Sequence, residues 1–476
     1  MSSPSLRERI RAGLEKTFDQ EDLDLTEGGI GKPLVYLSIP IVVTNLFQTA
    51  YNLADTFWVG QYSTDALAAI SFAFPMVFLL ISLGMGLSVA GSVMVAQNVG
   101  AGNEREAEYA ASQTLVFAVA TSVLLGLVGY FVVDDLLLFF GAAPDVYPLA
   151  VAYMRVISLG LVFMFGFLMF ISLMRGYGDT VTPMVVMFFS VVLNIALDPF
   201  LIFGWWVFPR MGLEGAAVAT VFSRALAFVA GVAVMFTGVR GVEVNVRDMA
   251  PDFGFARRIL RVGLPASIEG TGRALSVNLM LLVVGLFPTN VVAAFGIGTR
   301  VLSVVFMPAI AVARGVETMS GQNIGAEKYN RAAAAARFAA KAMFVMLSAV
   351  GVVGWIWARP IISVFTTDAA VVDIGVTFMR YVAPTFGFMG IMRSYNGSFR
   401  GAGKTLTAAA ISVGSLGAVR LPFAWVASQS FGHEGIWLSF AVSNVLGALA
   451  AYAWYQRDTW RAAEIVDDPA AVAMDD

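Results

Sequence analysis

Apolar residues run along most of the chain in long stretches, and short polar segments separate these stretches. A helix needs about 20 apolar residues to cross a bilayer, and inside lipid every backbone amide must bond within its own element. The pattern therefore predicts an all-α membrane protein rather than an open sheet. We expect twelve transmembrane helices, at residues 33–60, 67–96, 110–133, 148–173, 181–206, 213–237, 258–287, 291–319, 332–357, 375–398, 404–428 and 433–456.

The second half of the chain repeats the polar motifs of the first half. The segment VMVAQNVGAGNEREA at 93–107 aligns with TMSGQNIGAEKYNRA at 318–332, and Pro40 aligns with Pro265 at the same separation along the chain. A repeat of this length sets the architecture of a fold. Because six helices return the chain to the side on which it began, the copies are parallel repeats. Two six-helix lobes around a central cavity are an arrangement typical of transporters.

The basic residues predict the orientation and the limits of the parts. Lys and Arg near helix ends gather on the side that carries both termini, and only Arg210 and Arg359 lie on the other side, which places both termini in the cytoplasm. The expected parts are an N-terminal cytoplasmic tail at 1–30, a first lobe at 31–237, a cytoplasmic linker at 238–256, a second lobe at 257–456 and an acidic cytoplasmic tail at 457–476.

The composition excludes several classes of protein. Apolar residues make up 58% of the chain, charged residues only 13%, and the mean hydropathy is +0.77, far from the values of a soluble domain. Cysteine is absent, which excludes disulfides and thiol chemistry. We find no nucleotide-binding loop, no His/Cys metal cluster and no nucleophile triad, so we expect neither an enzyme nor a nucleic-acid-binding protein. Any transport would have to be driven by an ion gradient.

Two aspartates lie inside apolar stretches of the first lobe. Asp55 stands in VTNLFQTAYNLADTFWVG and Asp198 in MVVMFFSVVLNIALDPFLIFGWW, with Asn194 one turn before it. A carboxylate in hydrocarbon costs roughly 2.5 kcal/mol or more, so it usually faces a cavity and marks an ion pathway. The second copy has Met280 and Phe423 at the equivalent positions, so the fold itself does not require the acids. A site for H⁺ or Na⁺ is predicted; the alternative is that the acids cap a helix or lie at the membrane interface.

Other residues share helix faces with these acids. Gln48 and Tyr51 lie two turns and one turn before Asp55, and Met187 lies on the face of the second acidic helix that carries the amide. These side chains either line a cavity or mediate contacts between helices. Pro40 interrupts the hydrogen bonds of the first helix, as a static kink or as a hinge.

The second lobe carries the opposite charge inside its apolar segments. We expect these residues to form ion pairs that hold helices together rather than to contact a substrate. We expect Arg400 and its repeat partner Arg175 to anchor helices at the membrane interface. The charged residues within the segments are Arg273, Arg300 and Arg420, Glu269 one turn from the first of them, and the neighbours Arg314 and Glu317.

Six motifs of the first lobe carry a resemblance to a known family. They are IP at 39–40, YNLADTFWVG at 51–60, VAQNVGAG at 95–102, LMRGYGDT at 173–180, NIALDP at 194–199 and GAAVAT at 215–220. Together with QNIGA and FRGAGKT of the second copy, they resemble the multidrug and toxic compound extrusion (MATE) transporters, and among these the DinF-like prokaryotic branch.

The resemblance implies a secondary multidrug efflux antiporter whose two lobes open alternately to either side of the plasma membrane. It implies export of cationic drugs or metabolites by a monomer, in exchange for H⁺ or Na⁺ and without any other cofactor or metal. The residues implied are Asp55, Asp198, Asn194 and Thr220 for the ion, Gln48, Tyr51 and Met187 for the drug cavity, and Pro40 for bending of the first helix.

Two alternatives remain open on the sequence. A lipid-linked oligosaccharide flippase of the same superfamily would have a strongly cationic cavity, for which Arg273, Arg300 and Arg420 are candidates; the acids of the first lobe argue against it. A membrane enzyme or scaffold would show no ion-coupled flux. Other branches of the family place carboxylates on the seventh and tenth helices. This chain has Met280 on the seventh and no acid in the tenth, so Glu269 is the substitute candidate.

Overall fold

The computed structural model describes residues 24–461 except for 140 and 239, and all regular elements within that range are helices. The predicted tails at 1–30 and 457–476 therefore lie mostly outside the described residues. Ten helices are long and apolar enough to cross a membrane. The more polar α8 and the interrupted helix α12–α13 bring the spans within the described range to the predicted twelve. The chain is a multi-pass, all-α membrane protein.

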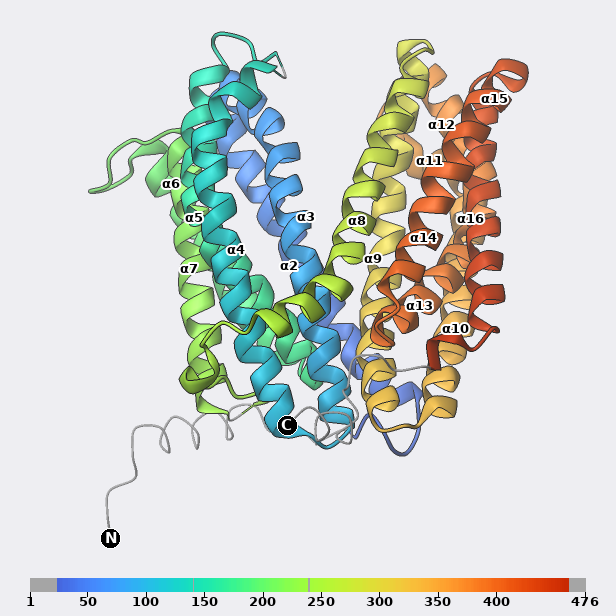
Figure 1. The fold of residues 1–476 in the computed structure, drawn as a ribbon. Helices are drawn as coiled ribbons and strands as arrows, with labels where there is room; N and C mark the ends of the chain where they lie inside the picture. Colours follow the sequence, from blue (N-terminus) through green and yellow to red (C-terminus); the bar gives the residue numbers. More distant parts are fainter. Residues whose placement is uncertain (1–23, 140, 239, 462–476) are drawn as a thin grey trace. The chain divides into compact units, whose positions relative to one another are not determined.

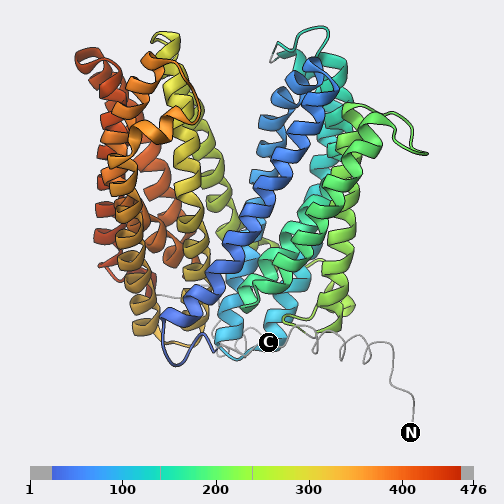
Figure 2. The same ribbon diagram turned by 180° about the vertical axis from the view of Figure 1, so that it is seen from behind.

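The first half of the chain contains six long helices, which Figures 1 and 2 show from opposite sides. They are α2 (Gly31–Tyr62), α3 (Thr64–Gly100), α4 (Glu104–Phe139), α5 (Tyr147–Tyr177), α6 (Val181–Phe203) and α7 (Leu213–Thr237), followed by the short 3₁₀ helix η1 (Val246–Asp248).

The second half has six spans built from more pieces. They are α8 (Phe253–Val284), α9 (Thr289–Gly325), α10 (Tyr329–Ile356), α11 (Ala358–Ser363), α12 (Ala369–Val382), η2 (Ala383–Thr385), α13 (Phe386–Gly401), α14 (Thr405–Val413), the π-helical η3 (Gly414–Arg420), α15 (Leu421–Phe431), α16 (His433–Tyr455) and η4 (Thr459–Arg461).

Two of the predicted helices are interrupted. The span expected at 375–398 contains the 3₁₀ turn η2, because Pro384 lacks the amide hydrogen that a continuous helix needs. The span expected at 404–428 contains the π segment η3, which begins at Gly414. Such π segments are rare and occur mostly as single-turn bulges inside α-helices.

The chain divides into two compact units at two prolines related by the repeat. Unit 1 contains residues 40–264, and unit 2 contains residues 24–39 together with the chain from 265 onward. Pro40 and Pro265 lie inside α2 and α8, so each of these helices contributes its first part to one unit and its remainder to the other. The start of α2 packs on α9, where Ser38 lies directly against Gly315. The lobe limits expected from the sequence, 31–237 and 257–456, stay a prediction.

Each unit has a central helix that crosses its neighbour closely at a glycine. A Cβ on Gly176 in α5 would lie 2.4 Å from the carbonyl oxygen of Ser92 in α3. A Cβ on Gly401 in α13 would lie 2.3 Å from the carbonyl oxygen of Glu317 in α9. The second pair follows the first at the separation that relates Pro40 to Pro265. The repeat thus preserves the same helix crossing, which small residues permit in membrane proteins.

The segment between α7 and α8 is bound to α4. Arg105 donates to both carboxylate oxygens of Asp248, at 2.5 and 2.6 Å, and Gln113 donates to the carbonyl oxygens of Asp248 and Ala250. Tyr109 donates to Asp252 at 2.8 Å. The hydrogen bonds from Arg105 lower the pKa of the Asp248 carboxyl. This segment therefore follows a defined path along unit 1.

Candidate functional site

The two acids predicted from the sequence lie on different helices of unit 1 and are both buried. Asp55 in α2 is 6% exposed, and Asp198 in α6, next to Pro199, is 0% exposed. Their helices pack against each other, with the ring centres of Phe47 in α2 and Phe188 in α6 5.3 Å apart. The structure therefore brings together two carboxylates from the first and fifth helices of the unit, which are far apart in the sequence.

Asp55, Asp198 and the neighbouring Asn194 each have one buried side-chain oxygen that accepts no hydrogen bond from the described residues. Asn194 donates to Asp198 Oδ1 at 3.4 Å. Asp55 Oδ1, Asn194 Oδ1 and Asp198 Oδ2 are buried and form no hydrogen bond with the described residues. Buried polar atoms are almost always bonded, and an exception calls for an explanation such as an ion or a water molecule. Three free oxygens are a suitable set of ligands for a small cation.

Thr220 contacts the helix of Asp55 through a tyrosine. Its hydroxyl lies 2.8 Å from the hydroxyl of Tyr51, and both side chains are buried. Because Tyr51 is one turn from Asp55, this bond ties α2 to α7 beside the acid. Thr220 is thus next to the acidic site, through Tyr51.

An arginine that the sequence analysis did not single out lies among the predicted cavity residues. Arg224 in α7 is buried and donates to Gln48 Oε1 at 2.8 Å and to Met187 Sδ at 3.0 Å. Its guanidinium also lies 5.1 Å from the centre of the Tyr51 ring. The three residues predicted to line the cavity therefore gather around one buried cation. Arg224 is a basic residue inside the apolar segment 213–237. The criterion that selected the two acids, a charge within an apolar segment, could therefore have identified Arg224 from the sequence.

The charged residues of unit 2 form a separate network. Arg400 is buried and donates to both oxygens of Glu269, at 3.1 and 3.0 Å, and to Glu317 at 3.1 Å. The prediction that Arg400 anchors a helix at the interface is wrong, because these two carboxylates offset its charge inside the unit. Ser412 also donates to Glu269, at 2.8 Å. The predicted Arg314–Glu317 pair is confirmed, at 2.9 Å.

The three arginines considered for a cationic cavity do not meet at one place. Arg420 donates to Ser443 and to Asn444 in α16 and lies 4.1 Å from the centre of the Phe440 ring. Arg300 is exposed on α9. Arg273 interacts electrostatically with Glu269.

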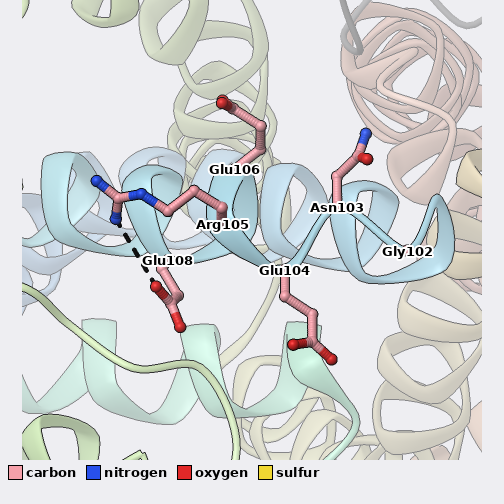
Figure 3. A pocket seen from close by; sticks show the side chains of 6 residues that line it. All are labelled: Gly102, Asn103, Glu104, Arg105, Glu106 and Glu108. Atoms are coloured by element: carbon pink, nitrogen blue, oxygen red, sulfur yellow. Dashed lines mark ion pairs between the residues drawn. The ribbon is translucent and has the colours of Figure 1, made fainter.

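A surface pocket at the turn between α3 and α4 contains none of the predicted site residues. Figure 3 shows Glu106 and Glu104 pointing in opposite directions, while Arg105 and Glu108 point toward each other. Arg105 and Glu108 form an ion pair at 3.7 Å within it. The lining residues are Gly102, Asn103, Glu104, Arg105, Glu106 and Glu108.

Comparison with known proteins gives consistent results. The family model described as MatE matches residues 40–200 and 265–426. The probable multidrug resistance protein YoeA of Bacillus subtilis is 28% identical over 436 residues, which cover 89% of this chain and 94% of that protein. The FAD transporter of Shewanella oneidensis is 27% identical over 434 residues, 91% of this chain and 96% of that protein.

A solved structure agrees with the fold over nearly the whole chain. The outward-facing conformation of a multidrug resistance MATE family transporter of the MOP superfamily has a TM-score of 0.85 and 25% identity, covering 92% of this chain and 98% of that one. The two ranges matched by the family model begin at the repeat-related residues Pro40 and Pro265 and together span more than half of the sequence. The chain therefore belongs to the MatE family of multidrug and toxic compound extrusion transporters.

Proposed function

We propose that this chain is a secondary multidrug efflux antiporter that exports organic cations in exchange for H⁺ or Na⁺ by alternating access. Relatives named as multidrug resistance proteins support the substrate class. The observation that carries the coupling is the set of three buried oxygens without a donor, on Asp55, Asn194 and Asp198. Buried ionisable groups in a membrane protein commonly mark ion pathways.

The charges around this site support binding of one monovalent cation at a time. Asp55 and Asp198 contribute two negative charges, and Arg224 contributes one positive charge nearby, so the formal charge is −1. One proton or one Na⁺ neutralises it. Thr220 supplies a further hydroxyl oxygen beside Tyr51, and these oxygen ligands suit either ion.

Helix α2 is the element through which ion binding would be coupled to drug release. The Tyr51–Thr220 and Gln48–Arg224 hydrogen bonds hold it to α7. Neutralising Asp55 removes a charge from the same face of α2 and changes the balance of these contacts. Pro40 lets the helix bend as they change. A ligand shifts such an equilibrium only by its different affinity for the two states, which competition between drug and ion for this face supplies.

The remaining features of the proposal concern the membrane and the substrate. The transporter works as a monomer in the plasma membrane with both termini in the cytoplasm, in keeping with the distribution of Lys and Arg. Its drug cavity includes Gln48, Tyr51 and Met187, whose amide, phenol and thioether groups can accommodate many flat organic cations.

Transport in proteoliposomes tests the proposal. The purified protein is reconstituted, a proton or a sodium gradient is imposed alone, and movement of a fluorescent cationic dye is recorded. One of the two gradients should drive dye transport, and Asp55→Asn and Asp198→Asn should abolish it. Asp65→Asn, which changes an exposed aspartate near the start of α3, is the matched control and should leave transport unchanged.

Two results would contradict the proposal. Full dye transport by both Asp→Asn variants at normal expression would show that the acids do not couple transport. Absence of dye movement under either gradient would favour a membrane enzyme or scaffold.

A further inference from the structure

The residues of unit 2 that correspond to the proposed drug-cavity residues of unit 1 are charged or polar. In the register that aligns Pro40 with Pro265, Arg273 occupies the position of Gln48, and Ser412 occupies that of Met187. One turn before Gln48, Thr44 corresponds to Glu269. The repeat thus places charged groups where unit 1 has neutral ones.

These groups belong to a buried cluster on four helices. Glu269 of α8 accepts hydrogen bonds from Arg400 of α13 and from Ser412 of α14. Arg400 also donates to Glu317 of α9, which accepts a second hydrogen bond from Arg314. Both glutamates are therefore occupied by partners within the cluster.

Two further arginines reach the cluster without a partner of their own. Arg273 lies one turn after Glu269 on α8, and Arg393 lies two turns before Arg400 on α13, so both are on helices that form the cluster. Both also interact electrostatically with Glu269. Neither forms a hydrogen bond or an ion pair with another residue in the described parts of the chain, and Arg393 Nε is buried. Both residues are partly exposed.

The cluster carries more positive than negative charge. Its four arginines, Arg273, Arg314, Arg393 and Arg400, face two glutamates, which leaves a formal charge of +2. Charges inside a membrane protein are normally paired or serve a ligand. Structural ion pairing explains Arg314 and Arg400, and it leaves Arg273 and Arg393 unexplained.

We propose that Arg273 and Arg393 form a binding site for an oxyanion, the carboxylate or phosphate group of a small molecule that the transporter carries. A guanidinium group presents two parallel N–H donors that match two oxygens of a carboxylate or phosphate, which favours an oxyanion over a halide. Glu269 and Glu317 orient the neighbouring arginines and leave these two donors for the ligand. The site does not depend on ion coupling in unit 1, so either proposal can fail alone.

Binding of a carboxylate dye to the full-length protein in a neutral detergent tests this site. Fluorescein anisotropy is compared with that of a cationic rhodamine ester, and protein-free micelles give the background. Arg273→Gln and Arg393→Gln should each weaken fluorescein binding by about tenfold or more, the loss expected for one charge-assisted hydrogen bond. Arg393→Lys, which keeps the charge, should restore part of the binding.

A matched control and a check of folding complete the design. Arg300→Gln removes an exposed arginine from α9, outside the cluster, and should leave fluorescein binding unchanged. The thermal unfolding of each variant, followed in the same detergent, shows whether it is folded. Unchanged binding in folded Arg273→Gln and Arg393→Gln proteins would overturn the proposal.

Competition distinguishes the possible sources of the oxyanion. Inorganic phosphate should displace fluorescein from the wild-type protein if the site recognises the free group of a soluble substrate. Displacement by phosphatidylglycerol, with no effect of phosphate, would show that a lipid headgroup occupies the site and would overturn the assignment to a transported molecule. Asp55→Asn should still bind fluorescein, because its change lies in unit 1.

Discussion

Replacing Glu317 with glutamine would remove one negative charge from the centre of unit 2 while keeping nearly the same side-chain volume. The carboxylate oxygen Oε2 lies 2.9 Å from Arg314 Nη1 and 3.1 Å from Arg400 Nε, and the side chain is 1% exposed. Glutamine can place its amide oxygen at the position of Oε2 and accept from both arginines, but it carries no negative charge, and its NH₂ group would take the position of Oε1, 3.2 Å from the Arg314 donor. The variant therefore leaves the Arg314 guanidinium, whose side chain is 18% exposed, without a counter-charge, while Arg400 keeps Glu269.

The burial of Glu317 and its contacts with two arginines determine how much the substitution should lower the free energy of unfolding. A hydrogen bond to a charged group contributes about 1.5–3 kcal/mol. Removal of one partner from a buried ion pair costs about 3–5 kcal/mol, because the remaining charge stays desolvated. Since Glu317 serves two arginines and is almost fully buried, we expect Glu317→Gln to lower the free energy of unfolding by an amount in that second range.

Equilibrium unfolding in mixed micelles of dodecyl maltoside and SDS, followed by tryptophan fluorescence, measures this loss. The matched control is Asp134→Asn, which breaks the Arg155–Asp134 pair at a similar distance, 2.8 Å. Its side chains are 42% and 38% exposed, so the pair should contribute only about 0–1 kcal/mol. If Glu317→Gln costs no more than Asp134→Asn, burial does not decide the strength of these pairs and the reasoning is refuted.

Two further predictions concern helix packing and the linker. Gly397→Ala places a Cβ 2.3 Å from the carbonyl oxygen of Ala313 and should destabilise the protein by about 1–3 kcal/mol in the same assay. In the control Gly296→Ala, the new Cβ meets no atom within 4 Å, so this variant should be as stable as the wild type. Equal effects of the two substitutions would contradict the packing argument. Arg105 lowers the pKa of Asp248 in the folded protein. The contribution of this pair to the free energy of unfolding is therefore complete above the unfolded pKa of about 3.9, and it is lost as the pH falls through the lower folded pKa. Relative to an unstructured peptide substrate, pepsin should therefore cut the 240–252 segment faster as the pH falls below about 3.9, and a constant relative rate would refute the role of the pair.

The helices and the repeat could be predicted because lipid limits the choices available to the backbone. Long apolar runs in a bilayer must be helical, and repeated motifs with one separation imply repeated packing. The interruptions of the tenth and eleventh spans were not predicted. Pro384 was a local signal for the first of them, whereas the π segment at 414–420 contains no proline.

The candidate site was predictable only in part. Asp55 and Asp198 stand out because a charge in an apolar run is rare, and Arg224 satisfies the same criterion. What the sequence does not contain is the approach of α7 to α2, which brings the Arg224 guanidinium to Gln48. The net charge of the site depends on that approach and not on any helix alone.

The prediction for Arg400 failed for a related reason. Its repeat partner Arg175 and the surrounding RGYGDT motif suggested a common position at a helix end. The partner that decides its environment, Glu317, stands on another helix where the first copy has Ser92. Two differences, Glu269 for Thr44 and Glu317 for Ser92, thus surround Arg400 with carboxylates that the first copy lacks.

The same backbone therefore carries two different charge arrangements. The crossings at Gly176 and Gly401 are geometrically alike, so equivalent positions in the two units are held at equivalent places. The acidic pair and Arg224 leave a formal charge of −1 in unit 1, and the arginine cluster leaves +2 in unit 2. Because helix packing depends on the small residues at the crossings, the side chains beside them are free to change charge without loss of the fold. Under our two proposals, a duplicated scaffold binds a cation in one unit and an oxyanion in the other.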